Sequence, residues 1–166
     1  MIRHAALVFG FIAPCVAIAT GCHQPAQTSP APIAGDSLKG IVSITGTSFE
    51  QLIVLRSGNS VTRLSAATPD SGALSRMGGI EVMVYGRRTP TQFLVDRFTA
   101  MSVAGAPVVD GILKNDDGRL VLETIRGRLP LGNPPTALRG MVGARVWIAG
   151  PLDTGPNSYG VIAPLL

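Results

Sequence analysis

The chain has few of the residues on which catalysis most often depends. Its 166 residues include two histidines, His4 and His23, and both precede the region that we expect to fold. An expected folded region without imidazole excludes a Ser-His-Asp site and any metal site built on histidine. No phosphate-binding or dinucleotide-binding glycine pattern runs from a strand into a helix. We therefore expect no metal, no cofactor and no enzymatic activity.

Aromatic residues are also scarce, at 5% of the chain. Proteins that bind single-stranded nucleic acid stack the bases on aromatic side chains beside a basic groove. The formal net charge of +4 is too small to imply strong electrostatic attraction. We expect no nucleic-acid partner.

No apolar run is long enough to cross a membrane, but the chain begins with a shorter one. A basic start at Arg3 leads into about 15 apolar residues, fewer than the roughly 20 that span a bilayer. This pattern predicts a secretory signal peptide over residues 1–21. The residues around its end, Ala19-Thr20-Gly21-Cys22, resemble the lipobox of bacterial lipoproteins.

This resemblance implies cleavage before Cys22 and a diacylglycerol on its thiol. The protein would then be held on a membrane of the bacterial cell envelope, facing the periplasm or exposed at the surface. Ala17-Ile18-Ala19 also fits an ordinary secretory cleavage site, which would release a soluble protein with a free thiol at Cys22. Cys15 lies within the expected leader, so we expect no disulfide within the mature chain.

The following residues predict a tether and then an all-β fold. Residues 22–37 are rich in Pro, Ala, Ser and Thr and have little to bury, so we expect a disordered tether. From Gly40, short apolar runs alternate with turn residues. The expected strands of the first part are 41–45, 51–56, 61–65, 80–86 and 93–100. A tight hairpin turn is expected at residues 57–60, with positive φ at Gly58 and Asn59.

The same order of elements then appears again. Residues 73–86 align without gaps on residues 137–150, with six of fourteen positions identical. Upstream, Gly40-Ile41 matches Gly111-Ile112, and the turn at 57–60 is matched to residues 115–118. We interpret this pattern as an internal duplication of a small β unit.

Each copy is expected to contain a short helical turn before its last two strands. Asp70 or Ser71 is the expected cap of the first turn, and Thr136 of the second. Gly79 and Gly143 are expected where a barrel bends or where another backbone approaches.

This order of strands and helix is similar to the OB-fold, a five-stranded barrel with a helix between its third and fourth strands. The resemblance implies two tandem OB-like five-stranded units, over residues 38–104 and 105–166. A unit of about 65 residues is marginal alone, so the two are expected to pack together. One β-sandwich built from both copies is the alternative.

Arginine supplies 12 of the 14 basic residues, and its planar side chain binds phosphate or carboxylate through paired hydrogen bonds. Trp147 is expected on the strand face opposite Val146 and Ile148, in an aromatic strip that is either exposed for binding or buried between the two units. The candidate binding residues are Arg87, Arg88, Arg126, Arg128, Arg145, Tyr85, Trp147 and Tyr159.

Carboxylates are the remaining candidates for acid-base chemistry. Asp116-Asp117-Gly118 is typical of a hairpin turn, and Glu81 and Glu123 are expected to be solvated single residues. We therefore expect a membrane-anchored, non-enzymatic binding or scaffold module with an envelope protein or glycan as partner. The alternatives are a carboxylate-dependent hydrolase of envelope polymers and an arginine-mediated binder of anionic glycans or lipid headgroups.

Overall fold

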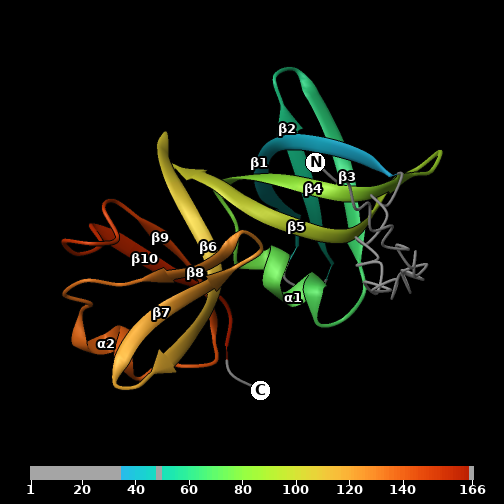
Figure 1. The fold of residues 1–166 in the computed structure, drawn as a ribbon. Helices are drawn as coiled ribbons and strands as arrows, with labels where there is room; N and C mark the ends of the chain where they lie inside the picture. The colour runs from blue at the N-terminus through green and yellow to red at the C-terminus, as the bar shows by residue number, and fades with distance from the viewer. Residues whose placement is uncertain (1–34, 48–49, 165–166) are drawn as a thin grey trace, which may run out of the picture. The chain divides into compact units, whose positions relative to one another are not determined.

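The computed structural model describes residues 35–47 and 50–164, which form an all-β structure with two short helices (Figure 1). The strands of the first half are β1 (Asp36–Gly46), β2 (Gln51–Ser57), β3 (Ser60–Ala66), β4 (Ile80–Arg88) and β5 (Phe93–Val103). Those of the second half are β6 (Ala106–Asp116), β7 (Arg119–Thr124), β8 (Gly127–Pro130), β9 (Arg145–Ala149) and β10 (Ser158–Ala163). The helices are α1 (Asp70–Ser75) and α2 (Thr136–Arg139). The expected all-β class is confirmed.

The first half shows how closely the strands follow the apolar pattern. All five expected strands are present, and β1 begins at Asp36 rather than at residue 41 because its polar start pairs with the end of β4. In β4, Ile80, Val82 and Val84 are buried, and the residues between them are half-buried. The expected signal peptide, Cys22 and the tether up to residue 34 lie outside the described residues.

The five strands of the first half form a closed ring. Strand β1 pairs with β2 and β4, β2 pairs with β3, and β4 pairs with β5. A short parallel pairing of β3 with β5 completes the ring, at Leu64 opposite Phe93. The side chains that point inward form a core that includes the fully buried Val42, Val82 and Phe93.

The second half repeats these antiparallel pairings but does not close. Strand β6 pairs with β7 and β9, β7 with β8, and β9 with β10. Among the described strands, β8 and β10 do not pair with each other. The loops after β8 and β9 meet instead, where the Gly132 N–H donates to the Leu152 carbonyl at 2.7 Å. The two halves therefore share their antiparallel pairings and differ in closure, and their assignment as tandem OB-like units stays a prediction.

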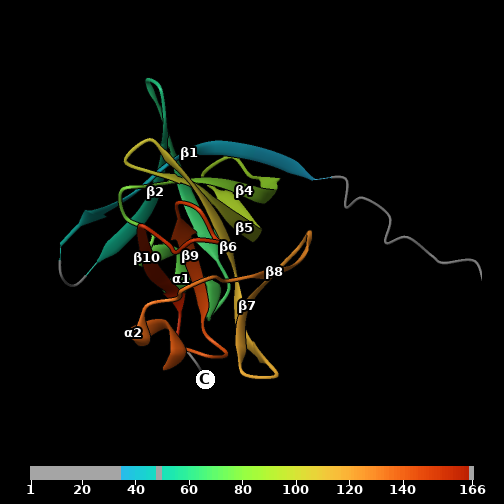
Figure 2. The same cartoon turned by 60° about the vertical axis from the view of Figure 1, so that its left-hand side comes forward.

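A hairpin between β5 and β6 carries the chain from one half to the other (Figure 2). It pairs Ser102 with Pro107 and Val103 with Ala106, so the ten strands belong to one continuous sheet. Contacts group residues Ala34–Leu166 into a single unit, and each half has its own apolar core within it.

Gly79 and Gly143 occupy matching positions in the two halves. The Gly79 N–H donates to the Val42 carbonyl at 2.9 Å, and the Gly143 N–H donates to the Leu113 carbonyl at 2.7 Å. Both glycines have positive φ, +79° and +93°. Positive φ is what favours glycine at Gly79, because a Cβ there would meet nothing within 4 Å. The expected close approach of another backbone is therefore wrong for Gly79, and for Gly143 it stays a prediction.

Two expectations about turns are wrong. The turn at residues 57–60 joins β2 to β3, and its counterpart in the second half joins β7 to β8 at residues 124–127, not at 115–118. Gly58 has positive φ but Asn59 does not. In a two-residue turn with glycine first, only that first position requires positive φ. The turn at Asp117 and Gly118 requires positive φ at both positions, and both residues have it.

The expected helix caps are also wrong. Neither α1 nor α2 has a side-chain cap, and the residues before them are Pro69 and Pro135. Asp70 and Thr136 are instead the first residues of the helices, and Ser71 lies within α1. The Ala73 N–H, which a cap at Asp70 or Ser71 could accept, donates instead to the Pro69 carbonyl at 3.2 Å.

Candidate binding surfaces

The candidate arginines lie in separate places rather than in one patch. Arg87 and Arg88 are exposed at the end of β4, beside the start of β1. Arg126 is exposed in the turn between β7 and β8, and Arg128 follows it in β8. Arg145 begins β9, where the two halves meet. No single anion-binding surface therefore contains all five.

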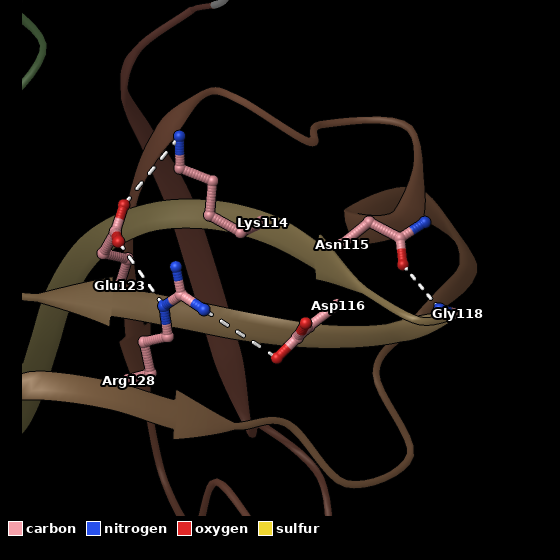
Figure 3. Close-up of polar contacts among 6 residues, drawn as sticks. All are labelled: Lys114, Asn115, Asp116, Gly118, Glu123 and Arg128. Carbon is pink, nitrogen blue, oxygen red and sulfur yellow. Dashed lines mark hydrogen bonds and ion pairs between the residues drawn. The ribbon is translucent and has the colours of Figure 1, made fainter.

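Arg128 belongs to a chain of ion pairs on the outer face of β6, β7 and β8 (Figure 3). Its Nε lies 3.6 Å from Glu123 Oε1, and its Nη1 lies 4.0 Å from Asp116 Oδ2. Lys114 Nζ lies 3.8 Å from the other oxygen of Glu123. These side chains are 39–62% exposed, so the pairs contribute little to stability, but they leave Arg128 with two carboxylate partners.

The expected carboxylate pair forms a turn. The Asn115 Oδ1 accepts a hydrogen bond from the Gly118 N–H at 2.9 Å (Figure 3). Asp116 pairs with Arg119 across the hairpin. Glu123 is not the solvated single residue that the sequence suggests, because it has two cationic partners.

Arg145 binds Asp110 within the second half and reaches the backbone of the first half. Its Nη2 lies 2.6 Å from Asp110 Oδ2 and donates to the Phe98 carbonyl at 2.6 Å, and its guanidinium lies 4.5 Å from the centre of the Phe98 ring. Asp110 is buried, and its carboxylate also accepts the Ala100 N–H at 3.1 Å. Arg145 therefore holds β5 against β6 and β9 and is not free to bind an external anion.

The three aromatic candidates do not form a strip. Tyr85 lies on β4 beneath Arg97, whose guanidinium is 4.3 Å from the ring centre. Trp147 is half-buried against the core of the first half, with its indole over Gly160 of the neighbouring strand. Tyr159 packs against the core of the second half. Trp147 thus lies between the two halves, as one of the two sequence interpretations has it.

A cleft with a volume of about 480 Å³ lies on the outer face of β1, β4 and β5. The hairpin between β5 and β6 forms one wall. Ile41 and Met101 are apolar side chains that remain 47% and 36% exposed there. Lys39, Glu81 and Ser102 supply its polar groups.

Glu81 is held in its charged form in this cleft. The Ser102 hydroxyl donates to Glu81 Oε2 at 2.9 Å, and Lys39 Nζ lies 3.2 Å from Oε1. The hydrogen bond from Ser102 and the charge of Lys39 lower the pKa of Glu81 below its usual value. Glu81 is thus another carboxylate that the sequence wrongly places alone.

Sequence reasoning missed Asp110, Lys39 and Met101. Asp110 interrupts the apolar run from Val108 to Leu113, which was the available signal for a buried carboxylate. Lys39 precedes Gly40 just as Asp110 precedes Gly111, so the repeat alignment places the two residues at equivalent positions. Met101 carries no comparable signal, because its exposure depends on a bulge in β5.

Comparison with protein-family models, curated proteins and solved structures found no match to this chain. Within residues 35–47 and 50–164, no helix is long and apolar enough to cross a membrane. The same residues contain no group of three or more side chains that could hold a metal ion.

Proposed function

We propose that this protein is a lipid-anchored component of the bacterial cell envelope that acts as a non-enzymatic binding or scaffold module. The anchor rests on the leader that ends at Thr20-Gly21-Cys22. Each buried methylene of an acyl chain contributes about 0.8 kcal/mol, and one chain gives only reversible binding. A diacylglycerol on Cys22 supplies two chains and so a stable attachment.

The observation that carries the binding role is the cleft at Lys39 and Glu81. Ile41 and Met101 leave apolar surface in water beside a charged pair. An apolar centre with a polar rim is the usual composition of a protein-binding surface. The cleft therefore favours a protein partner over catalysis.

The experiment compares two photoreactive positions in cells. A photoreactive amino acid at position 101 lies in the cleft, and the same group at position 125 replaces Ile125, which is 84% exposed on the β7–β8 turn. We expect a defined protein adduct from position 101 and none from position 125. Identical adducts from both positions would contradict a binding role for the cleft.

A second candidate function is binding of anionic headgroups through Arg87 and Arg88. Both are exposed and have no ion-pair partner within the described residues. They follow Gly86, which pairs with Asp36 at the start of β1, so they lie where the tether joins the fold. Loss of binding to anionic vesicles on Arg87→Ala/Arg88→Ala, with retention by Arg126→Ala, would support this role.

A further inference from the structure

The second half docks on the first through a definable face. Asp110 and Arg145 bond to the β5 backbone, and Trp147 packs against the first core. Ile162 of β10 is fully buried and belongs to the core of the first half rather than of its own. We call Asp110, Arg145, Trp147 and Ile162 the second-half face.

The first half carries an equivalent face. Glu81 of β4 pairs with Ile41 and Ser102, just as Arg145 of β9 pairs with Ile112 and Ala163. The pairing of β4 with β5 shifts register next to Glu81, and the pairing of β9 with β10 shifts register next to Arg145. The residue in the bulge is Met101 in the first half and Ile162 in the second. In the repeat, the residues equivalent to Asp110, Arg145, Trp147 and Ile162 are, in that order, Lys39, Glu81, Met83 and Met101. We call the former set the first-half face.

These two faces differ in burial. Ile162 is 0% exposed, whereas Met101 is 36% exposed beside the open cleft. The Asp110 side chain is 4% exposed, whereas that of Lys39 is 52% exposed. The first-half face therefore has the position of a docking face but no occupant within the described chain.

The second-half face contacts a surface of the first half, and the second half has an equivalent of that surface. In the first half it consists of β5 and α1, which contact Arg145 and β10. Its equivalent in the second half is β10 with α2, which we call the second-half end. Among the described strands, β10 pairs with β9 alone, whereas β5 pairs with β3, β4 and β6. Met77 after α1 is 0% exposed, whereas Met141 after α2 is only partly buried. Within the described residues, the second-half end is therefore less covered than its counterpart in the first half.

We propose that copies of this chain associate head to tail, with the first-half face of one copy on the second-half end of the next. Asp110 and Arg145 grip a strand backbone through one acceptor and one donor. The equivalent positions of the first-half face carry the opposite charges, Lys39 in place of Asp110 and Glu81 in place of Arg145, so the proposed contact is carried by Met83 and Met101 rather than by this polar pair. In both views α2 lies away from β1, so one molecule does not make this contact with itself (Figures 1 and 2). Because such a contact joins two different surfaces, each copy can bind a further copy, and the assembly grows in a row.

The first test measures the mass of the purified chain from residue 22 by sedimentation. Cys22→Ser removes any lipid or disulfide contribution, so the result does not depend on the proposed anchor. We expect the mass to rise with concentration, and Met101→Asp to abolish the rise. Ile125→Asp, on an exposed turn outside both surfaces, is expected to associate as the parent does. A parent that stays monomeric at every concentration, or equal association by Met101→Asp, would overturn the proposal.

The second test separates a head-to-tail contact from a symmetric one. Met101→Asp blocks the first-half face, and Met141→Asp blocks the second-half end. Each variant alone is expected to be monomeric, and their mixture is expected to form a one-to-one dimer, because each supplies the surface that the other lacks. Two monomers in the mixture would contradict the proposal. Trp147 fluorescence checks whether the Met141→Asp variant is folded. If this variant is unfolded, Arg139→Glu takes its place in the mixture, because Arg139 is an exposed residue of α2.

Discussion

At the scale of single residues, the account depends most on the Asp110–Arg145 pair. A buried carboxylate that accepts a backbone N–H and an arginine is stabilised only while both partners remain. The pair joins β6 to β9 within the second half, and its bonds to the Phe98 carbonyl and the Ala100 N–H connect it to the first half. Loss of this pair should therefore lower the free energy of unfolding of both halves.

We predict that Arg145→Met lowers the free energy of unfolding by about 3 kcal/mol, because it leaves Asp110 charged and unpaired in the interior. Urea unfolding followed by Trp147 fluorescence measures this. Arg145→Met/Asp110→Leu should recover part of the loss, since it removes both charges. Arg128→Met is the matched surface control and is expected to change stability by less than about 1 kcal/mol.

Glu81 gives a prediction about pH. Its pKa is lowered in the folded state, so the stability it contributes is present above the unfolded value of about 4.5 and is lost as pH falls through the lowered pKa. The stability difference between the parent and Glu81→Gln should shrink as pH falls below that value. A difference that is constant from pH 7 to pH 3, by denaturant titration, would contradict the contacts with Ser102 and Lys39.

The sequence located individual site residues only in part. Arg145 is a candidate for ligand binding from the sequence, but in the structure it binds Asp110, which is distant in the sequence, and the Phe98 carbonyl. Arg128 and Glu123 were read as free charges because partners on neighbouring strands depend on register. Spacing along one strand cannot provide that register, and so ion pairs between strands were missed.

At the level of strands, the pairing of β6 with β7 depends on the close approach of their backbones at Gly111. A Cβ there would lie 2.5 Å from the Glu123 carbonyl oxygen and 2.9 Å from the Leu122 side chain. We predict that Gly111→Ala destabilises the fold by about 1–3 kcal/mol, because β6 and β7 must separate to accept a methyl group. Gly140→Ala is the control, since its Cβ would meet only ordinary contacts at 3.6 Å. Equal thermal midpoints for the two variants would contradict the pairing of β6 with β7.

The strands were predictable and the closure of the ring was not. Alternation of apolar and polar residues marks β4 well, and glycine marks the turns at Gly58 and Gly118. The parallel pairing of β3 with β5 joins strands that the sequence separates by α1 and β4. In the second half, Gly132 contacts the loop after β9, a meeting of two loops that periodicity does not reveal.

At the scale of the whole molecule, Trp147 reports on how the two halves pack. Its indole is half-buried against the first core, so a neutral quencher should reach it less readily than it reaches the unfolded chain. We predict a blue-shifted emission for the parent and stronger quenching for Arg145→Met. Quenching of the parent that equals that of the unfolded chain would contradict contact between the halves. Ile125→Ala, on a distant turn, should leave quenching unchanged.

The proposed function depends on attachment to the envelope through Cys22, and the mass of the peptide that contains Cys22 tests this attachment. The protein is taken from the membrane fraction of cells that express the full chain, and its N-terminal peptide is analysed by mass spectrometry. The account predicts a peptide that begins at Cys22 and carries acyl chains, and a Cys22→Ser variant that leaves the membrane fraction. A peptide that begins at Thr20 with an unmodified thiol would contradict it.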